Sequence, residues 1–219
     1  MLKIELMYND THLDFPTDLP LAVLEPQKEA AKEPRTYTLA EYLRREEDSK
    51  ELHEYYNGTI IKLHNAGGSQ NTITANITAS LKFALKQTGK TYFVRVGQQL
   101  VYIPKLNLGL YPDALVVSET PQYFDKNEVL LTNPILIVEV LSKSTKKYDR
   151  SEKFEEYRTL DSFREYVLID QKRCHIQLRY RETPDTWRYT EITDMTGSIF
   201  LKSLGCSILV ADIYENVKV

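Results

Sequence analysis

Two carboxylates and a lysine near the middle of the chain have the residue types that metal-dependent chemistry requires. Glu139 is the one charged residue in the apolar run 135–141, Ile-Leu-Ile-Val-Glu-Val-Leu. A run this rich in β-branched residues predicts a strand buried on both faces. An ionised carboxylate inside such a strand costs several kcal/mol unless a cation or hydrogen bonds compensate it. Glu139 is therefore expected to have a positively charged partner nearby.

Asp113 supplies the second carboxylate. It follows Pro112 and begins another apolar run over 113–118. Adjacent strands would bring Asp113 and Glu139 together at one edge of a sheet, and with a lysine close by they would form an oxygen site suited to Mg²⁺ or Mn²⁺. Each acid also has a plainer explanation. A strand glutamate often pairs with a structural Lys or Arg, and Pro-Asp is often only a turn device.

Two lysines follow the strand that contains Glu139. Lys143 lies in the basic loop 142–148, and Lys153 lies on a predicted helix that is capped by Asp149 or Ser151 and ends near residue 159. A lysine has a long stem, so a helix packed on the strand can direct Lys153 toward the acids. Asp149 stands four residues before Lys153, on the same predicted helical face, and is expected to orient it.

The surrounding sequence predicts a mixed α/β or α+β domain around one sheet. Residues 1–34 are rich in proline and charge and are interpreted as an extension that lies on the surface or is partly mobile, which places the domain at 35–219. A capping box at Thr38 and Glu41 begins the first helix, Asn57-Gly58 indicates a hairpin, and the apolar stripe of 70–87 indicates a long helix. Strands are predicted at 92–96, 98–103, 113–118, 135–141, 164–170, 174–181, 187–192, 199–201 and 208–210, before a helical turn at 211–214.

Composition limits the class of protein. The 219 residues are 42% hydrophobic and no Gly/Ser linker divides them, which favours a single well-packed domain. The net charge of −3 argues against binding nucleic acid through a global basic field, although a metal ion would bring its own positive charge. The two cysteines lack CxxC spacing, no apolar run reaches the ~20 residues of a membrane span, and the first residues lack a signal-peptide core. We therefore expect a cytoplasmic protein with no membrane segment.

Taken in order, these motifs resemble the Uma-type restriction endonuclease family of the PD-(D/E)xK nuclease superfamily. The resemblance extends from about residue 37 to 214, and it implies a restriction-endonuclease-like fold with a mixed central sheet flanked by helices and antiparallel C-terminal strands. It rests on Tyr-Thr-Leu-Ala-Glu-Tyr-Leu at 37–43, Glu54 before Asn57-Gly58, Tyr111-Pro112-Asp113, Glu139-Val-Leu-Ser142, Tyr148-Asp149, Lys153, Tyr157, Arg164-Glu165-Tyr166 and Leu168-Ile-Asp170.

The same resemblance implies roles for individual residues. The superfamily's usual lysine lies two positions after the acid, where this chain has Leu141, so Lys153 is the expected substitute and Lys143 its rival. Glu54 is implied as a third acid that reaches the metal directly or through water. Gln98 is a weaker candidate from a strand that would border the site. The basic residues Lys146, Lys147 and Arg150 are expected to contact DNA phosphates.

Two functions fit this pattern. The first is a metal-dependent endonuclease acting on DNA, in which Asp113 and Glu139 bind Mg²⁺ (or Mn²⁺) and Lys153 activates water; a homodimer is expected by analogy with nucleases that cut both strands. The second is a catalytically silent binding or scaffold protein that keeps the nuclease fold. In that case the acids would pair with Lys153 as a salt-bridge core and no metal-dependent activity would be found.

Overall fold

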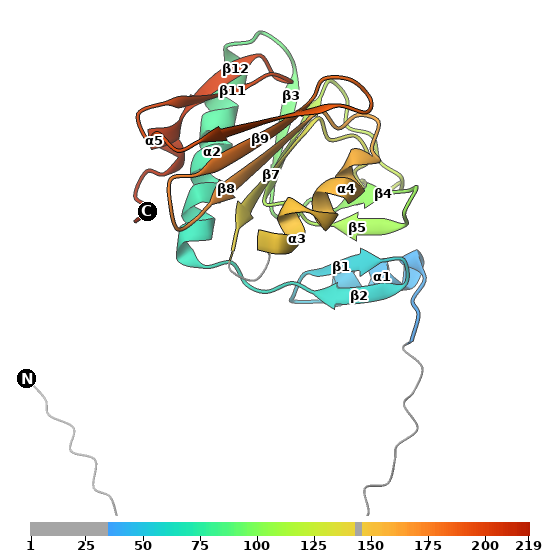
Figure 1. Cartoon of the computed structure of the whole chain (residues 1–219). Coiled ribbons are helices and arrows are strands. Elements are labelled where there is room, and N and C mark those ends of the chain that lie inside the picture. The colour runs from blue at the N-terminus through green and yellow to red at the C-terminus, as the bar shows by residue number, and fades with distance from the viewer. Residues whose placement is uncertain (1–34, 143–145) are drawn as a thin grey trace, which may run out of the picture. The chain divides into compact units, whose positions relative to one another are not determined.

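A six-stranded mixed sheet forms the centre of the computed structural model, in the order β10-β9-β8-β7-β6-β3 (Figure 1). Neighbouring strands are antiparallel except β7 and β8, which are parallel. The structure describes residues 35–142 and 146–219, so the extension predicted at 1–34 lies outside the described residues. The strands of this sheet are β3 (Tyr92–Val96), β6 (Ala114–Ser118), β7 (Leu136–Leu141), β8 (Glu165–Asp170), β9 (Ile176–Arg181) and β10 (Trp187–Ile192).

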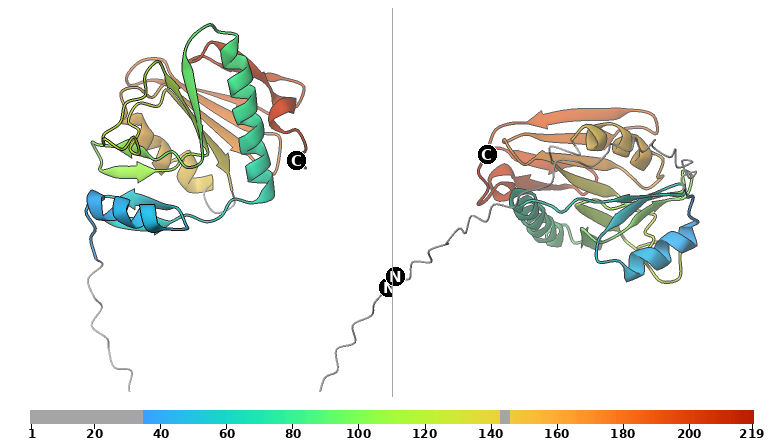
Figure 2. Two further views of the ribbon diagram at one scale, coloured as in Figure 1. Left: turned by 180° about the vertical axis from the view of Figure 1, so that it is seen from behind. Right: turned by 90° about the horizontal axis from the view of Figure 1, so that it is seen from below.

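One face of this sheet packs against the long helix α2 (Gly68–Lys86), as two views of the ribbon show (Figure 2). Side chains of a strand alternate between faces, and Val116 and Val138 point to the side where Ile77 and Leu81 of α2 complete a buried apolar cluster. The C-terminal hairpin β11 (Ser198–Leu201) and β12 (Cys206–Leu209) and the short helix α5 (Val210–Ile213) contribute to the same cluster.

The opposite face packs against helices α3 (Lys146–Arg150) and α4 (Glu152–Arg158) and against a second sheet. Leu115 and Ile137 share a second cluster there with Phe154 and Tyr157 of α4. The second sheet has the order β2-β1-β5-β4, and helix α1 (Leu39–Asp48) packs on it through a third cluster. Its strands are β1 (His53–Tyr56), β2 (Thr59–Lys62), β4 (Val101–Ile103) and β5 (Leu108–Leu110).

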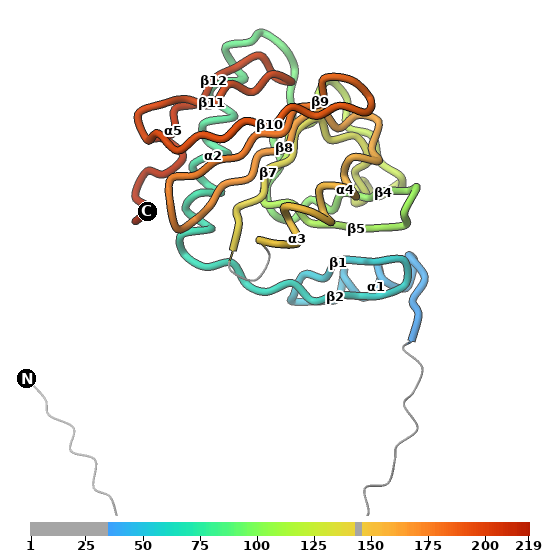
Figure 3. Tube along the Cα trace, in the orientation of Figure 1, coloured from blue at the N-terminus to red at the C-terminus, as the bar shows by residue number. Residues whose placement is uncertain are grey.

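The connection from β7 to β8 carries α3 and α4, as the chain trace shows (Figure 3). Two parallel neighbouring strands need a crossover of this kind because a tight turn cannot join them. Aromatic contacts fix the crossover to β8: the Tyr166 hydroxyl donates to the Asp149 carbonyl over 3.0 Å, and the Tyr166 and Phe154 rings stack with centroids 5.6 Å apart.

The hairpin of β1 and β2 turns at Asn57 and Gly58, which both have positive φ, 44° and 104°. Such values are required by the two-residue turn that matches the twist of the strands. A Cβ added at Gly58 would lie 2.4 Å from Thr36 Cγ2. The hairpin matters for function because β1 carries Glu54.

We expect Gly58→Ala to lower the free energy of unfolding by about 1–3 kcal/mol, because alanine adds both backbone strain at φ 104° and a clash with Thr36. Urea unfolding followed by circular dichroism measures the change. Gly68→Ala is the control, since a Cβ there meets nothing within 4 Å. Equal stabilities of the two variants would contradict the prediction.

The mixed sheet between helices, with antiparallel strands toward the C-terminus, confirms the predicted fold class. Some boundaries were predicted wrongly. The strand predicted at 98–103 comprises only β4, and Gln98 lies exposed in a bend after Gly97, whose φ of 52° interrupts the extended chain. Strand β5 was not predicted. None of the helices in the described part of the chain is long and apolar enough to span a bilayer.

Candidate active site

The ammonium group of Lys153 lies between two carboxylates and a main-chain carbonyl. Its Nζ is 2.9 Å from Glu139 Oε1 and 3.2 Å from Glu54 Oε1, and it donates to the carbonyl of Tyr111 over 3.3 Å. Lys153, Glu139 and Glu54 are 5%, 3% and 3% exposed. The cluster therefore joins α4, β7 and β1 in the interior, between the two sheets.

Packing of α4 determines the direction of Lys153. Phe154 and Tyr157, on the same helix, are fully enclosed in the core, and the Tyr157 hydroxyl reaches Glu139 Oε1 at 3.4 Å. Of the two caps that the sequence allowed for this helix, Asp149 and Ser151, the structure has Ser151, whose φ and ψ are −121° and −82°. Asp149 therefore belongs to α3, which ends at Arg150, and does not share a helical face with Lys153, which corrects the predicted i, i+4 arrangement.

Asp113 lies beside Glu139 on the neighbouring strand. Strands β6 and β7 are antiparallel with Ala114 opposite Val138, and one further step in this register places Asp113 opposite Glu139. The main-chain N–H of Val140 donates to Asp113 Oδ2 over 2.7 Å, and Gln70 Nε2 donates to Oδ1 over 3.0 Å. Two hydrogen bonds thus hold the Asp113 carboxylate against β7.

Burial and mutual repulsion set the charge of this cluster. Burial raises the pKa of Glu139 well above its ordinary range, and the negative charge of Asp113 adds to this while Lys153 opposes it. Burial also raises the pKa of Asp113, although its hydrogen bonds act in the opposite direction. For Lys153, burial alone would lower the pKa, but the carboxylates of Glu139 and Glu54 raise it well above the ordinary value. Lys153 is therefore an ammonium ion at neutral pH.

A chain of tyrosine hydroxyls supports Glu54, and sequence reasoning did not identify it. Tyr56 donates to Glu54 Oε2 over 3.0 Å and also contacts the Tyr148 hydroxyl, which in turn donates to Glu156 Oε2 over 2.7 Å. The main-chain N–H of Tyr111 donates to Glu54 Oε1 over 3.1 Å. Tyr56 was detectable in principle, because residues two apart in a strand share a face. Its partner Tyr148 is 92 residues away in sequence.

The basic residues predicted to contact DNA have different surroundings. Lys146 Nζ is 2.7 Å from Asp170 Oδ2 and so belongs to an ion pair. Lys147 is exposed, and Arg150 is partly buried. Lys143, the rival of Lys153, lies outside the described residues.

The donor set of the cluster fits a hard divalent cation with two protein ligands. Mg²⁺ is usually held by one or two carboxylates, with water or substrate oxygens completing its shell, and Asp113 and Glu139 supply two carboxylates on adjacent strands. With Glu54 and Asp149, four carboxylates interact with one ammonium group, so an added cation would offset the excess negative charge. Within residues 35–142 and 146–219, no group of three or more His, Cys, Asp or Glu side chains is arranged to hold a metal. Glu54, predicted as a third ligand, contacts Lys153 as Glu139 does, and its role as a ligand stays a prediction.

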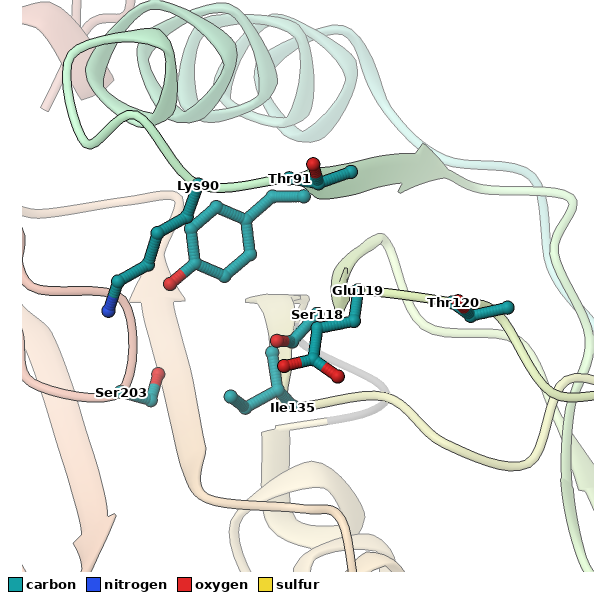
Figure 4. Close-up of a pocket in the computed structure, with 8 residues that line it drawn as sticks. Lys90, Thr91, Ser118, Glu119, Thr120, Ile135 and Ser203 are labelled. Carbon is teal, nitrogen blue, oxygen red and sulfur yellow. The ribbon is translucent and has the colours of Figure 1, made fainter.

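A cavity of about 600 Å³ lies at the other end of the central sheet. Ser118 ends β6 and Ile135 precedes β7, so this cavity is remote from Asp113 and Glu139 along both strands. None of the predicted site residues lines this cavity. Its lining, drawn in Figure 4, consists of Lys90, Thr91, Tyr92, Ser118, Glu119, Thr120, Ile135 and Ser203.

Comparison with known proteins assigns the chain to a family. Residues 39–210 match the family model Uma2, which is described as "Putative restriction endonuclease". The chain belongs to the Uma2 family. This match confirms the family resemblance drawn from the sequence motifs, and it includes Glu54, Asp113, Glu139 and Lys153 within the matched region.

Relatives of this Uma2 chain occur in cyanobacteria. Uncharacterized protein sll1609 of Synechocystis sp. (strain ATCC 27184 / PCC 6803 / Kazusa) is 36% identical over 123 residues, which cover 56% of this chain and 68% of the relative. Uncharacterized protein slr1290 of the same organism is 31% identical over 179 residues, which cover 81% of this chain and 90% of the relative. The crystal structure of a putative nuclease belonging to DUF820 from Anabaena variabilis ATCC 29413 superposes with a TM-score of 0.64 at 14% identity, over 81% of this chain and 97% of that chain. The Uma2 chain therefore shares the fold of that protein.

Proposed function

We propose that this Uma2 protein is a divalent-metal-dependent endonuclease that hydrolyses phosphodiester bonds of DNA. The observation that carries the proposal is that the main-chain N–H of Val140, next to Glu139, binds the Asp113 carboxylate over 2.7 Å, while the Lys153 ammonium lies 2.9 Å from Glu139. Family membership and the nuclease-type fold support the reaction class. Because each strand of a duplex needs its own cleavage event, we also propose a homodimer, which analytical ultracentrifugation tests.

Asp113 and Glu139 would hold Mg²⁺ or Mn²⁺. Such an ion supplies a bound water of lowered pKa and polarises a phosphoryl oxygen. The protein's own contribution is positional: hydrogen bonds from Val140 N–H and Gln70 fix Asp113, and the contact with the Tyr157 hydroxyl restrains Glu139.

Lys153 would act through its charge. Its raised pKa keeps the side chain protonated, so it donates hydrogen bonds and does not accept a proton from water. A buried ammonium beside the scissile phosphate would orient water and stabilise the negative charge that develops in the transition state. Glu54 and the Tyr111 carbonyl hold that ammonium in place. Lys147 and Arg150 would contact phosphates further along the DNA.

A second candidate function is a nuclease-fold binding protein without catalysis. It is favoured by the ion pairs of Lys153 with both Glu139 and Glu54, which give the buried ammonium two counter-charges without a metal. Paired buried charges avoid the large cost of an uncompensated one, so this cluster does not require a metal ion for its charges to be paired. The placement of Asp113 outside those ion pairs favours the nuclease.

Calorimetric titration with Mn²⁺ and Mg²⁺ separates the two candidates. We expect the wild-type protein to bind at millimolar or lower concentration, and Asp113→Asn to weaken binding by at least about tenfold because it removes a charged oxygen ligand. Asp161→Asn is the matched control, since the Asp161 side chain is 94% exposed and pairs only with the exposed Lys105 among the described residues. Absence of metal binding by the wild-type protein would exclude the nuclease and favour the binding protein.

A further inference from the structure

Two arginines near helix α4, Arg150 and Arg179, form no ion pair with any carboxylate in the described part of the chain. Arg179 of β9 is 7% exposed, and among residues 35–142 and 146–219 no carboxylate lies within ion-pair distance of it. Its Nε is buried without a hydrogen-bond acceptor. Arg150, at the end of α3, likewise has buried Nε and Nη2 atoms without acceptors. Buried guanidinium N–H groups without acceptors are costly, so this arrangement needs an explanation.

Aromatic rings hold Arg179 in position. It pairs in register with Tyr166 of β8 and with Tyr189 of β10, so the three side chains share one face of the sheet. The Arg179 guanidinium lies 4.4 Å from the centre of the Phe154 ring and 5.1 Å from that of Tyr189. Ring faces attract a cation but do not accept in-plane hydrogen bonds from it. The rings therefore retain the charge and leave N–H groups unsatisfied.

The charges of Glu155 and Glu191 act on Arg179 and Arg150 respectively, but among the described residues neither acid forms an ion pair with these arginines. Arg150 is close enough to Arg179 that its positive charge adds to burial in lowering the Arg179 pKa. The acids near them are engaged elsewhere: Glu155 pairs with Arg158 over 2.7 Å, and Glu191 accepts a hydrogen bond from Gln177 over 2.5 Å. An anion with several acceptor oxygens between the two arginines would offset their mutual repulsion and accept hydrogen bonds from their unsatisfied donors.

We propose that Arg150 and Arg179 form a binding site for a phosphate group of the DNA backbone, distinct from the phosphate at the Lys153 cluster. Arginine suits this ligand because its planar fork of N–H donors matches phosphate oxygens. The Lys153 side chain contacts β1 and β7, whereas its neighbour Phe154 packs on Tyr166 of β8 and Trp187 of β10, so the two sites lie on different sides of α4.

The choice of DNA over free phosphate rests on the proposed function and on Tyr189. The Tyr189 side chain is 60% exposed beside Arg179, and an exposed aromatic ring next to a phosphate contact provides a surface on which a base can stack. A site for inorganic phosphate would have no use for such a ring.

Fluorescence anisotropy with a labelled 20-base-pair DNA duplex in EDTA tests the site without metal or cleavage. We expect Arg179→Met and Arg150→Met each to weaken DNA binding by about tenfold and to reduce the slope of log affinity against log salt concentration by about one. Arg188→Met is the control for net charge, because Arg188 lies on the opposite face of β10 and pairs with Glu182 over 2.5 Å. Its affinity should equal that of the wild-type protein.

Unchanged DNA affinity in both arginine variants would overturn the proposal. Should Arg179→Met fail to fold, Arg150→Met decides alone, since Arg150 is only partly buried and has no ion pair among the described residues. A second experiment titrates the protein with inorganic phosphate and monitors binding through the fluorescence of Trp187, the single tryptophan. Arginine-dependent binding of phosphate without arginine-dependent binding of DNA would overturn DNA as the source. Arginine-dependent DNA binding by a protein that never cleaves DNA would support this site and contradict the proposed nuclease.

Discussion

Lys153→Met is expected to lower the free energy of unfolding by about 3–5 kcal/mol at neutral pH, the usual cost of removing one partner from a buried ion pair. The substitution keeps the length of the side chain but leaves Glu139 and Glu54, which are 3% exposed each, without their shared cation. Chemical unfolding, followed by Trp187 fluorescence, measures the loss. Lys105→Met is the surface control, because the Lys105 side chain is 64% exposed.

The effect of Lys153→Met should depend on pH in a defined direction. Burial raises the pKa of Glu139 above the ordinary value of 4.5, and loss of Lys153 removes the group that lowers it. The uncompensated carboxylate therefore destabilises the variant above that raised pKa, and protonation relieves the cost as pH falls through it toward 4.5. Wild-type Lys153 remains charged throughout this range, since its own pKa is raised.

A second substitution tests whether the uncompensated charge of Glu139 causes the loss of stability. Lys153→Met combined with Glu139→Gln should recover part of the lost stability at neutral pH, because the amide carries no charge. A destabilisation that is independent of pH and is not recovered in the double variant would contradict the account, and would assign the loss to packing around α4.

Glu139→Gln alone should reduce Mg²⁺-dependent cleavage of DNA by at least about 10³-fold, since a catalytic metal contributes several kcal/mol to transition-state stabilisation. The fold should be kept. The substitution removes one of the carboxylates that repel each other, and Lys153 retains Glu54 at 3.2 Å. Conversion of supercoiled plasmid to nicked and linear forms measures cleavage, and circular dichroism confirms folding.

Glu155→Gln provides the matched control for this experiment. Glu155 has the same side chain on α4, two residues from Lys153, but is exposed and pairs with Arg158. Its cleavage rate should equal that of the wild-type protein. Cleavage by Glu139→Gln at the wild-type rate would remove Glu139 from the mechanism, and cleavage by neither the variants nor the wild-type protein would favour the binding function.

Local patterns in the sequence predicted most of the architecture. The alternation and length of apolar runs indicated the strands that became β3, β6, β7, β8 and β10, and the four-residue spacing of Ile73, Ile77 and Leu81 indicated α2. Strand β5 was missed because it has three residues with Gly109 at its centre, which is too short and too weak a local signal. It forms because β1 and β4, from distant parts of the sequence or from across a turn, pair with it on its two edges.

The sequence showed which residue types form the candidate site, but it did not show which contacts those residues make. The sequence by itself determined that Glu139 lies in a buried strand and needs a positive partner, because the cost of a buried charge follows from its immediate neighbours. Only the tertiary structure decided how Lys153 is held, that Ser151 and not Asp149 caps α4, and which side chains surround Tyr148 and Arg179. These features depend on the packing of segments as far apart in sequence as Glu54 and Lys153, and no local periodicity records such contacts.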